Sequence, residues 1–404
     1  MKPASYTIVA TRSEGARFRD ADGNDYVDFC MSFGAALFGH APAFLQQALR
    51  DQIDRGFAVG PRPELASRVA DAIARATELE RVAFTCTGSE AIMLAIRAAR
   101  TATLRRQVVV FADSNHGQYD ATVVLPDPGG TPAAAYPNGP GIPPALVSDV
   151  LVLPYGSDHA LSEIDRRRDE LAAVLVEPIQ SRHLDVQPRS FLHELRRLTA
   201  DADIALVFDE MITGFRLAPG GAQEWFGVRA DLAVYGKALA AGMPIGVLAG
   251  TSRFMNALDG GVLHFDDAST PVAMTTFFSS TFAKHPLSLA AAEATLHELA
   301  ARGPALQREL NARTSVLVER LNACLANSDA GLRFVNAGSQ FGLTTQSDAD
   351  STVARLLHYW LSNRGVFLWA LNGFLATAHS AEDIERLIDG VQDAFAAAHG
   401  ASGR

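Results

Sequence analysis

The stretch Ile204–Arg216 reads IALVFDEMITGFR, in which an apolar run leads directly into Asp209 and Glu210. A short run that is apolar on both faces is typical of a strand inside a parallel sheet covered by helices. In open α/β sheets ligands gather at the carboxyl ends of strands, where Asp209 would lie. An acid there could bind a metal ion, cap a helix or face a ring nitrogen, and this stretch alone does not choose among them.

Similar runs recur along the chain and alternate with helical stretches such as Arg189–Ala202. Strands that alternate with helices predict an α/β domain with a mostly parallel central sheet. We expect its strands at Arg81–Cys86, Gln107–Phe111, Asp149–Leu153, Ala172–Glu177, Ile204–Asp209 and Asp231–Tyr235.

After about Leu287 the pattern changes to long helices, which include Ala349–Arg364 and a terminal helix opened by Ser380. Asp383 lies three residues after that serine, as in a capping box. These features predict a second, smaller α+β domain. The expected limits are an N-terminal segment 1–50 that joins the small domain, a large α/β domain 51–287, and a C-terminal small domain 288–404.

Two further segments have a local sequence pattern that predicts their backbone structure. Ala16–Asp28 holds two short alternating runs around Asp22-Gly23, which predicts a β-hairpin beside the C-terminal domain. Pro126 to Pro144 holds seven prolines and four glycines, which argues against regular helix or strand and predicts a long loop, either disordered or a lid over a site.

Bulk properties exclude several classes of protein. The formal net charge of −10 gives no basic field for nucleic acid. Cys30, Cys86 and Cys324 are odd in number and widely spaced, so neither disulfides nor a zinc cluster is indicated, and a reducing cytoplasm fits best. We expect no signal peptide, no membrane span and no metal site. His264 near Asp266 and Asp267 has metal-like composition, but such acids in a glycine-containing loop are usually solvated.

Two motifs complement Asp209. Thr87-Gly88-Ser89 lies between an expected strand and an expected helix, where glycine lets the backbone approach a ligand and the free N–H groups favour a phosphate. Gly236-Lys237-Ala238 places a lysine just past a strand among small residues, whereas lysines normally belong on solvated faces. A phosphate turn, a strand-end acid and a strand-end lysine, in that order, are the parts that a pyridoxal-phosphate site requires.

At this point the sequence resembles the class III aminotransferases and the glutamate-1-semialdehyde aminomutase group, which have the fold-type I architecture. Within them it is similar to the aminotransferase domains embedded in peptide and polyketide synthetases. The resemblance covers nearly the whole chain. It is carried by Phe33–Ala41 (FGAALFGHA), Thr87–Ala91 (TGSEA), Asn115–Gly117 (NHG), Val176–Ser181 (VEPIQS), Phe208–Arg216 (FDEMITGFR), Tyr235–Lys237 (YGK), Met243–Gly250 (MPIGVLAG) and Ser280–Leu287 (STFAKHPL).

The resemblance implies roles for individual residues. Lys237 would bind pyridoxal 5'-phosphate as a Schiff base, Asp209 would keep the ring nitrogen protonated, and Gly88-Ser89 would hold the phosphate. Thr281 would reach the phosphate from the neighbouring subunit, so the resemblance implies a homodimer with shared sites.

The resemblance also implies that five further residues contact the cofactor. Glu177, Gln180 and Glu210 would lie around the ring, and Asn115 and His116 would line the same site. Glu177 could equally be a strand-end carboxylate without a ligand, and His116 could be a hydrogen-bonding loop histidine rather than a catalytic one.

The expected reaction exchanges an amine between an amino donor and a keto or aldehyde acceptor. The pyridinium acts as an electron sink, and the released Lys237 is the natural base that moves a proton from the substrate carbon. The amine rests on the cofactor as pyridoxamine phosphate until a second carbonyl compound takes it.

Two departures from the family limit what the resemblance implies. Asn115 stands where relatives have an aromatic residue on the cofactor ring, so another residue, such as Tyr119, would have to cover that face. Trp369–Gly373 lacks the acid and the arginine of the related embedded domains, although Arg62 and Arg216 could compensate.

The missing arginine weakens the case for a simple α-amino acid. We therefore hypothesise amine exchange at a β-keto or aldehyde carbon of an acyl intermediate in biosynthesis, with an acyl carrier protein as a partner by analogy with the embedded domains. The rival readings are an aminomutase or amino-acid racemase on the same fold, and a catalytically idle binding protein.

Overall fold

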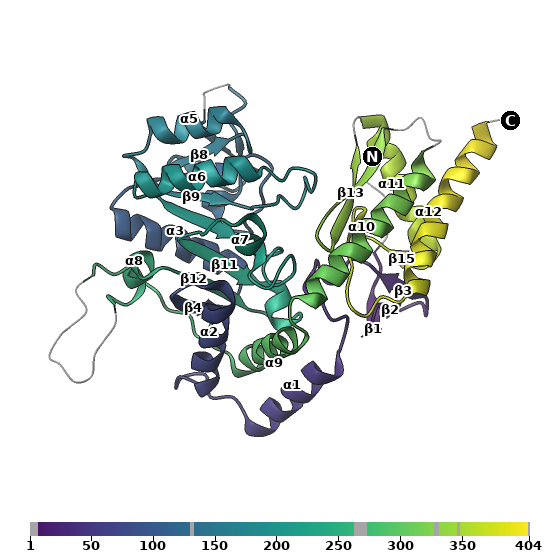
Figure 1. The fold of residues 1–404 in the computed structure, drawn as a ribbon, viewed down its shortest axis with the longest axis horizontal. Coiled ribbons are helices and arrows are strands. Elements are labelled where there is room, and N and C mark those ends of the chain that lie inside the picture. The colour runs from purple at the N-terminus through teal and green to yellow at the C-terminus, as the bar shows by residue number, and fades with distance from the viewer. Residues whose placement is uncertain (1–6, 130–132, 262–272, 327–330, 346–347, 403–404) are drawn as a thin grey trace. The chain divides into compact units, whose positions relative to one another are not determined.

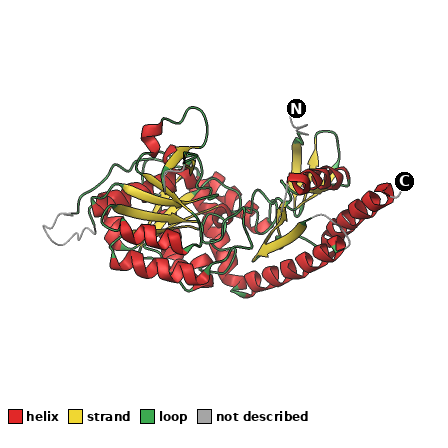
Figure 2. Cartoon of the chain, turned by 90° about the horizontal axis from the view of Figure 1, so that it is seen from above, coloured by secondary structure: helices red, strands yellow, loops and turns green. Residues whose placement is uncertain are grey.

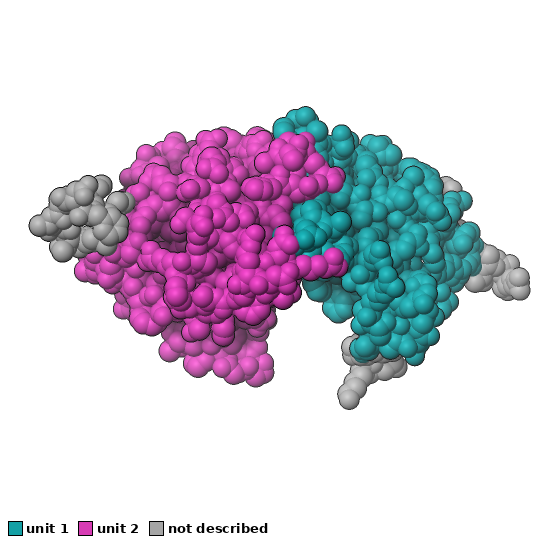
Figure 3. Space-filling view, turned by 90° about the horizontal axis from the view of Figure 1, so that it is seen from below, with its two compact units in different colours: residues 1–48, 304–404 teal, residues 49–303 magenta. Residues whose placement is uncertain are grey.

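The computed structural model describes residues 7–129, 133–261, 273–326, 331–345 and 348–402 (Figure 1). Contacts divide the chain into two compact units, Met1–Ala48 with Pro304–Arg404 and Leu49–Gly303, which Figure 3 colours separately. The domain limits expected from the sequence, 1–50, 51–287 and 288–404, stay predictions.

The unit Leu49–Gly303 is built on a seven-stranded sheet (Figure 2). In spatial order its strands are β4 (Arg81–Thr85), β12 (Gly246–Gly250), β11 (Leu232–Gly236), β10 (Ala205–Asp209), β9 (Leu171–Val176), β5 (Gln107–Phe111) and β8 (Val150–Leu153). β12 is antiparallel to both neighbours, and the other neighbouring pairs are parallel.

Strands β8 to β11 are buried along their whole length, which means that both faces of the sheet are covered. This is the α/β architecture with a mostly parallel sheet that the sequence predicts. The six expected strands are present, each within about a residue of its expected ends. The sequence pattern did not single out the antiparallel strand β12.

Helices of this unit follow the strands and cover them. Their bounds, beginning with the helix that crosses the limit between the units, are α1 (Ala43–Arg55), α2 (Glu64–Thr77), α3 (Gly88–Thr103), α4 (Pro144–Val147), α5 (Asp158–Arg166), α6 (Arg189–Asp201), α7 (Gly221–Phe226), α8 (Ser252–Met255) and α9 (Pro286–Arg302), with 3₁₀ turns at Asp120–Thr122, Lys237–Ala240 and Asn256–Leu258. Helix α3 packs on β9, β11 and β12 through buried residues at helical spacing, such as Ile92, Ala95 and Ala99.

The expected long loop Pro126–Pro144 is not free of regular structure, and that prediction was wrong in part. A two-stranded ladder pairs β6 (Val124–Pro126) with β7 (Ala135–Pro137). Prolines are tolerated there because each strand has only one partner, so the missing N–H can face outward. Residues 130–132 lie outside the described residues, and α4 begins at the last proline of the segment.

The other unit, Met1–Ala48 with Pro304–Arg404, is α+β. One sheet has the order β1 (Ala10–Glu14), β2 (Arg17–Asp20), β3 (Asp25–Asp28), β15 (Val366–Phe367), and another has β13 (Leu332–Ala337), β14 (Gln340–Thr345), β16 (Asn372–Phe374). Its helices are α10 (Ala305–Leu325), α11 (Asp348–Asn363) and α12 (Ala381–Ser402).

Two local predictions for this unit are confirmed. β2 and β3 form the expected antiparallel hairpin, and Val27 of β3 pairs with Val366 of β15. At the start of α12, the N–H and hydroxyl of Ser380 both donate to the carboxylate of Asp383, and the N–H of Asp383 donates back to the hydroxyl of Ser380. This reciprocal pairing is the capping box expected from the sequence.

Within the described part of the chain, no helix is both long enough and apolar enough to span a membrane.

Candidate active site

Asp209 is the last residue of β10, which lies between β9 and β11 near the middle of the sheet. Its Oδ2 is 2.8 Å from Nδ1 of His116, and the two side chains are almost fully buried, at 4% and 1% exposed. Its Oδ1 accepts a hydrogen bond of 3.1 Å from the N–H of Met211. The strand-end acid therefore has an imidazole as its direct partner.

Glu177 follows β9 directly and is buried beside this pair. Its carboxylate accepts hydrogen bonds from the backbone N–H groups of Asn115, at 2.9 Å, and Ser181, at 3.4 Å. Burial raises the pKa of Glu177, while His116 acts against that rise and Asp209 adds to it. Two carboxylates and one imidazole thus influence one another at neighbouring strand ends.

Lys237 comes immediately after β11 and opens a 3₁₀ turn. Its φ of 44° lies in the left-handed region, which costs a residue with a side chain about 1–2 kcal/mol. Burial lowers the pKa of the Lys237 amine, and Asp209 and Glu177 partly offset this effect. Because the charges of Asp209 and Glu177 act on it, the Lys237 amine belongs to the same electrostatic cluster as the two acids.

The turn Thr87-Gly88-Ser89 joins β4 to α3. The Thr87 hydroxyl caps α3 by accepting from the N–H of Glu90, so the helix begins at Gly88, within the segment that the sequence predicts as a turn before the helix. The Ser89 hydroxyl accepts from the N–H of Gln118 at 2.9 Å, which brings this turn against the segment that carries His116.

Glycines allow three segments to approach one another closely. A Cβ on Gly117 would lie 2.2 Å from the Ser89 hydroxyl, and a Cβ on Gly88 or on Gly236 would lie 2.7 Å and 2.6 Å from the Met211 side chain. Met211 therefore packs between the Gly88 turn and the residue before the lysine. Sequence reasoning missed Met211, although its place two residues after the strand-end acid was the available signal.

Glu210 has different surroundings from its neighbour Asp209. Its carboxylate accepts from the hydroxyl of Thr213 at 2.6 Å and from the N–H groups of Ala222 and Gln223 at 2.8 and 3.0 Å. It is fully buried, and burial raises its pKa to about 7. All of these contacts are with the start of α7 and the turn before it, so its expected position beside a ring stays a prediction.

Three more of the expected residues have neighbours on separate segments, and these are Gln180, Tyr119 and Thr281. The amide of Gln180 donates to the carbonyl oxygen of Ala112 and to the Ser114 hydroxyl, which ties it to the loop after β5. Tyr119 and Ser89 line one cavity of about 300 Å³. Thr281 is exposed, on a segment whose Ser280 hydroxyl is 3.4 Å from the sulfur of Cys86.

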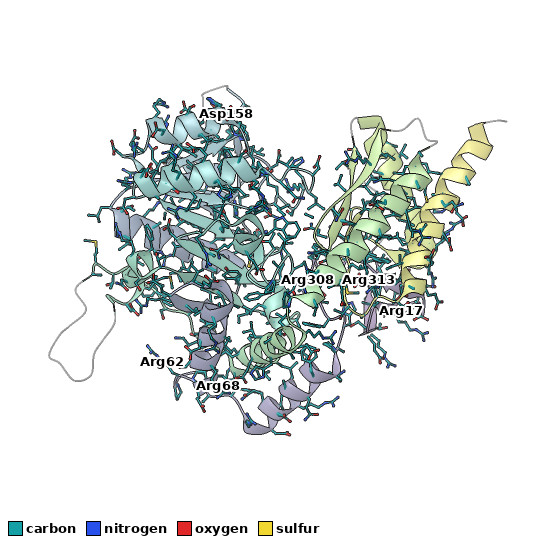
Figure 4. All side chains as sticks on the ribbon, viewed as in Figure 1. Arg17, Arg62, Arg68, Asp158, Arg308 and Arg313 are labelled. Carbon is teal, nitrogen blue, oxygen red and sulfur yellow. The ribbon has the colours of Figure 1, made fainter. Side chains whose placement is uncertain are left out.

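Arg62 and Arg216, which could compensate for the arginine missing near Trp369, differ in burial. Arg216 is buried, burial lowers its pKa, and its charge acts on Lys237. Arg62 is exposed and lies just before α2, where Figure 4 labels it. Trp369 to Gly373 form a tight turn in the other unit, with Ala370 and Leu371 at positive φ and Trp369 pairing with Asn372.

No group of three His, Cys, Asp or Glu side chains among the described residues could hold a metal ion. His264, Asp266 and Asp267 lie outside the described residues.

The arrangement can be tested against a phosphorylated pyridine aldehyde. Such a group needs an amine for its aldehyde, an acid for its ring nitrogen and backbone N–H groups for its phosphate. Lys237, Asp209 and Gly88-Ser89 offer these groups from neighbouring segments. In addition, Nε2 of His116 is buried and has no hydrogen-bond partner among the described residues, as in a site that a polar group completes. The residues fit the cofactor.

The fold and this set of side chains define a pyridoxal-phosphate-dependent transferase of fold type I. The sequence model of the family Aminotransferase class-III matches residues 1–372, and the chain belongs to that family of transaminases. Pyridoxal phosphate is its cofactor.

Comparison with individual proteins agrees with this family. The chain is 33% identical to a glutamate-1-semialdehyde 2,1-aminomutase of Archaeoglobus fulgidus, over 96% of this chain and 93% of the relative. It is 26% identical to a solved transaminase with pyridoxal phosphate bound, with a TM-score of 0.88 over 98% of this chain and 92% of that one. It is 29% identical to a β-phenylalanine aminotransferase of Variovorax paradoxus, with a TM-score of 0.84 over 99% and 89% of the two chains.

Proposed function

We propose that this transaminase exchanges an amine between an amino donor and a keto or aldehyde acceptor, with Lys237 as the cofactor lysine and the catalytic base. The observation that carries the proposal is the half-buried Lys237, whose amine feels the charges of Asp209 and Glu177. Because burial lowers the pKa of Lys237, a larger fraction of the amine is neutral, and a neutral amine can act as nucleophile and as base.

When bound, pyridoxal phosphate supplies an electron sink that makes a proton on a substrate carbon removable. Asp209 would hold the ring nitrogen of the cofactor, and His116 orients that carboxylate through its 2.8 Å contact. Nζ of Lys237 would take the proton from the substrate carbon and hold it for return within the site. The N–H groups at the start of α3 and the Ser89 hydroxyl bind the phosphate.

Gln180, Glu177 and Asn115 have positioning roles in this proposal, whereas Glu210 binds the start of α7. Gln180 is tied to the loop after β5, and Glu177 fixes the backbone of Asn115. These contacts support a rigid wall for the cofactor ring rather than further proton transfer. Tyr119 lines a cavity with Ser89 and is the candidate to cover the face that Asn115 leaves open.

For the substrate we propose amine exchange at a β-keto or aldehyde carbon of an acyl intermediate in a biosynthetic pathway, presented by an acyl carrier protein. The turn Trp369–Gly373 contains no charged side chain, so it offers no fork for the free carboxylate of an α-amino acid. Likeness to an enzyme named for β-phenylalanine supports a carbon other than the α-carbon.

A second candidate is an aminomutase, because several relatives at 30–33% identity are named glutamate-1-semialdehyde 2,1-aminomutase. A mutase moves the amine within one molecule, and a racemase only exchanges the α-proton with solvent. Incubation with an amino donor alone separates the three outcomes, because only a transaminase then accumulates the aminated cofactor and releases a keto product.

We also propose a homodimer with shared sites in the cytoplasm. Support comes from Thr281, which is exposed and is not among the described contacts of Asp209 or Lys237. A mixture of Lys237→Ala and Thr281→Ala chains should recover activity, because one site of the mixed dimer has both residues intact. Activity that never exceeds the sum of the two variants would contradict shared sites.

The deciding experiment for the function is a screen of amino donors against free keto acids, aldehydes and carrier-bound β-ketoacyl thioesters. We expect the absorbance of the cofactor to shift with donor and to return with the correct acceptor. A colourless protein that cannot be reconstituted with pyridoxal phosphate would favour the idle binding protein instead.

A further inference from the structure

The turn between β10 and α7 buries a positive charge. Arg216, in this turn, is only 2% exposed. Burial lowers the pKa of Arg216 to about 9, which still leaves its guanidinium charged at neutral pH. Burying a charge is costly, and a charge buried close to titratable groups is a candidate for a functional role.

This turn packs against the end of β11, where the lysine follows. The ring of Phe215 lies 5.4 Å from the ring of Tyr235, and Tyr235 is the second residue before Lys237. A Cβ on Gly214 would lie 2.6 Å from Cδ1 of the same tyrosine, so the backbone of the turn also approaches β11 closely. The two residues before Arg216 therefore contact the strand that ends at the lysine.

The backbone of the turn is fixed by hydrogen bonds and is strained. The N–H groups of Arg216 and Leu217 both donate to the carbonyl oxygen of Thr213, at 3.2 and 3.0 Å. Phe215 has a φ of 60°, in the left-handed region that is unfavourable for a residue with a side chain. Strained positions of this kind persist where the surrounding structure holds them, and they cluster at functional sites. The position of Arg216 is therefore set by its turn.

Charges of both signs act on the Lys237 amine. Burial lowers its pKa most, Asp209 and Glu177 raise it, and the charge of Arg216 lowers it again. Of the two acids, Asp209 is also paired with His116 at 2.8 Å. Two carboxylates favour the protonated amine, and the guanidinium opposes them. In the described part of the chain, Arg216 is the cation that acts on this amine.

We propose that Arg216 is a positioning residue for Lys237, whose buried guanidinium, held against β11 by its turn, repels the ammonium form and so favours the neutral amine. A neighbouring cation is an established means of activating a lysine, because the neutral amine is both nucleophile and base. The inference rests on the proposed function, since it takes Lys237 as the cofactor lysine.

The alternative role for Arg216 is to bind a substrate carboxylate in place of the arginine missing near Trp369. At 2% exposure, its side chain offers almost no surface to a ligand that enters from solvent. The two roles predict different effects. A charge that acts on Lys237 changes kcat in a pH-dependent way, whereas a carboxylate fork changes the KM of an acidic donor.

The test measures the Lys237 amine in the full chain loaded with pyridoxamine 5'-phosphate, the form of the cofactor that leaves this amine free. A lysine-acylating reagent is applied from about pH 6 to 9, and mass spectrometry follows Lys237 with Lys2 as an internal reference. We expect Arg216→Gln to slow acylation of Lys237 about threefold or more at neutral pH. The difference should shrink as the pH rises, because the amine then becomes neutral in both proteins. Arg216→Lys keeps the charge and should restore most of the rate.

The matched control is Arg105→Gln, which removes the same charge from a partly buried arginine at the other end of the sheet. Arg105 donates to the carbonyl oxygen of Ala202, just before β10 begins, at 2.8 Å, and its loss should leave acylation of Lys237 unchanged. Circular dichroism checks the fold of each variant. If Arg216→Gln does not fold, Arg216→Met, which buries no polar group, takes its place. Equal acylation in the wild type and a folded neutral variant would overturn the proposal, as would a fold that only Arg216→Lys retains.

Turnover of the holoenzyme gives a second readout. In Arg216→Gln, kcat should fall about threefold or more at neutral pH, with the acidic limb of its pH profile displaced to higher pH and KM little changed. A higher KM for an acidic donor together with unchanged acylation of Lys237 would assign Arg216 to substrate binding instead. Failure of the proposed function is seen separately, as the absence of a borohydride-fixed adduct on Lys237 of the wild type. Acylation of the cofactor-free chain then still decides whether Arg216 acts on the amine.

Discussion

Two neighbouring regions of the unit Leu49–Gly303 each contain a buried carboxylate, but the groups that surround the two carboxylates differ. At the end of β10, Asp209 faces His116 and interacts electrostatically with Glu177 and Lys237. One residue later, Glu210 is enclosed at the start of α7, where a hydroxyl and two backbone N–H groups bind its carboxylate. The comparison teaches that burial alone does not mark a functional acid.

The difference lies in what each carboxylate could still bind. Glu210 is surrounded by fixed donors of its own chain, so its hydrogen bonds hold α7 to the end of β10. Asp209 instead is paired with titratable groups whose charges respond to a ligand. We therefore expect changes around Asp209 to alter turnover, and changes at Glu210 to alter stability.

The largest effect is expected for Lys237→Ala. Loss of the amine removes both the attachment of the cofactor and the base, so kcat should fall by at least about 10²–10⁴-fold. Borohydride should fix the cofactor to the wild type at Lys237 only, as read by mass spectrometry. An adduct located on Lys284, or substantial turnover by the variant, would remove the basis of the proposed mechanism.

The next effect is expected for Asp209→Asn. The amide keeps the size of the side chain but removes the charge opposite the ring nitrogen, so kcat/KM should fall on the order of 10²–10³-fold. Borohydride should still fix the cofactor, because Lys237 is untouched. The prediction fails if Asp209→Asn and Glu210→Gln reduce turnover equally, since the two regions would then be equivalent.

A smaller loss is expected for His116→Ala. It removes the partner 2.8 Å from the Asp209 carboxylate, and a hydrogen bond to a charged group is worth about 1.5–3 kcal/mol, so kcat/KM should fall roughly ten- to a hundredfold. His116→Gln, which can still donate a hydrogen bond, should recover part of this loss. The pH dependence of the cofactor absorbance should shift in His116→Ala, which a purely structural role would leave unchanged.

The smallest effect on turnover, within a few-fold, is expected for Glu210→Gln, which should instead change how stability depends on pH. Burial raises the pKa of Glu210 from 4.5 to about 7, so between these values the folded protein keeps a proton that the unfolded chain releases. The free energy of unfolding should therefore fall as the pH rises through this window, by up to about 3 kcal/mol from this group.

Urea unfolding from pH 4.5 to 8 measures the difference between wild type and Glu210→Gln. The variant should lack the contribution of this group and lose less stability as the pH rises. His379, whose pKa burial lowers to about 4, contributes a slope of the opposite sign that is common to both proteins and cancels in the comparison. Parallel curves for the two proteins would show that the carboxylate titrates at its ordinary pKa.

Much of the fold could be predicted because strand patterns are local. Runs that are apolar on both faces identified the strands of the central sheet, and a serine and an acid three residues apart identified the start of α12. The segment Pro126–Pro144 was harder, because a proline composition argues against strands in general and yet permits a two-stranded ladder with open outer edges. β12 contains two glycines and was missed for lack of a β-branched or alternating pattern.

The sequence by itself determined the family of this protein, and it supplied the order of expected phosphate turn, acid and lysine on which the proposed chemistry rests. It could not say that His116 would meet Asp209, 93 residues away, or that Met211 would pack between Gly88 and Gly236. Nor could it separate Asp209 from Glu210. The reason is physical, because strand order decides which loops meet at one edge of the sheet, and packing around each carboxylate decides whether its oxygens meet fixed backbone donors or titratable partners.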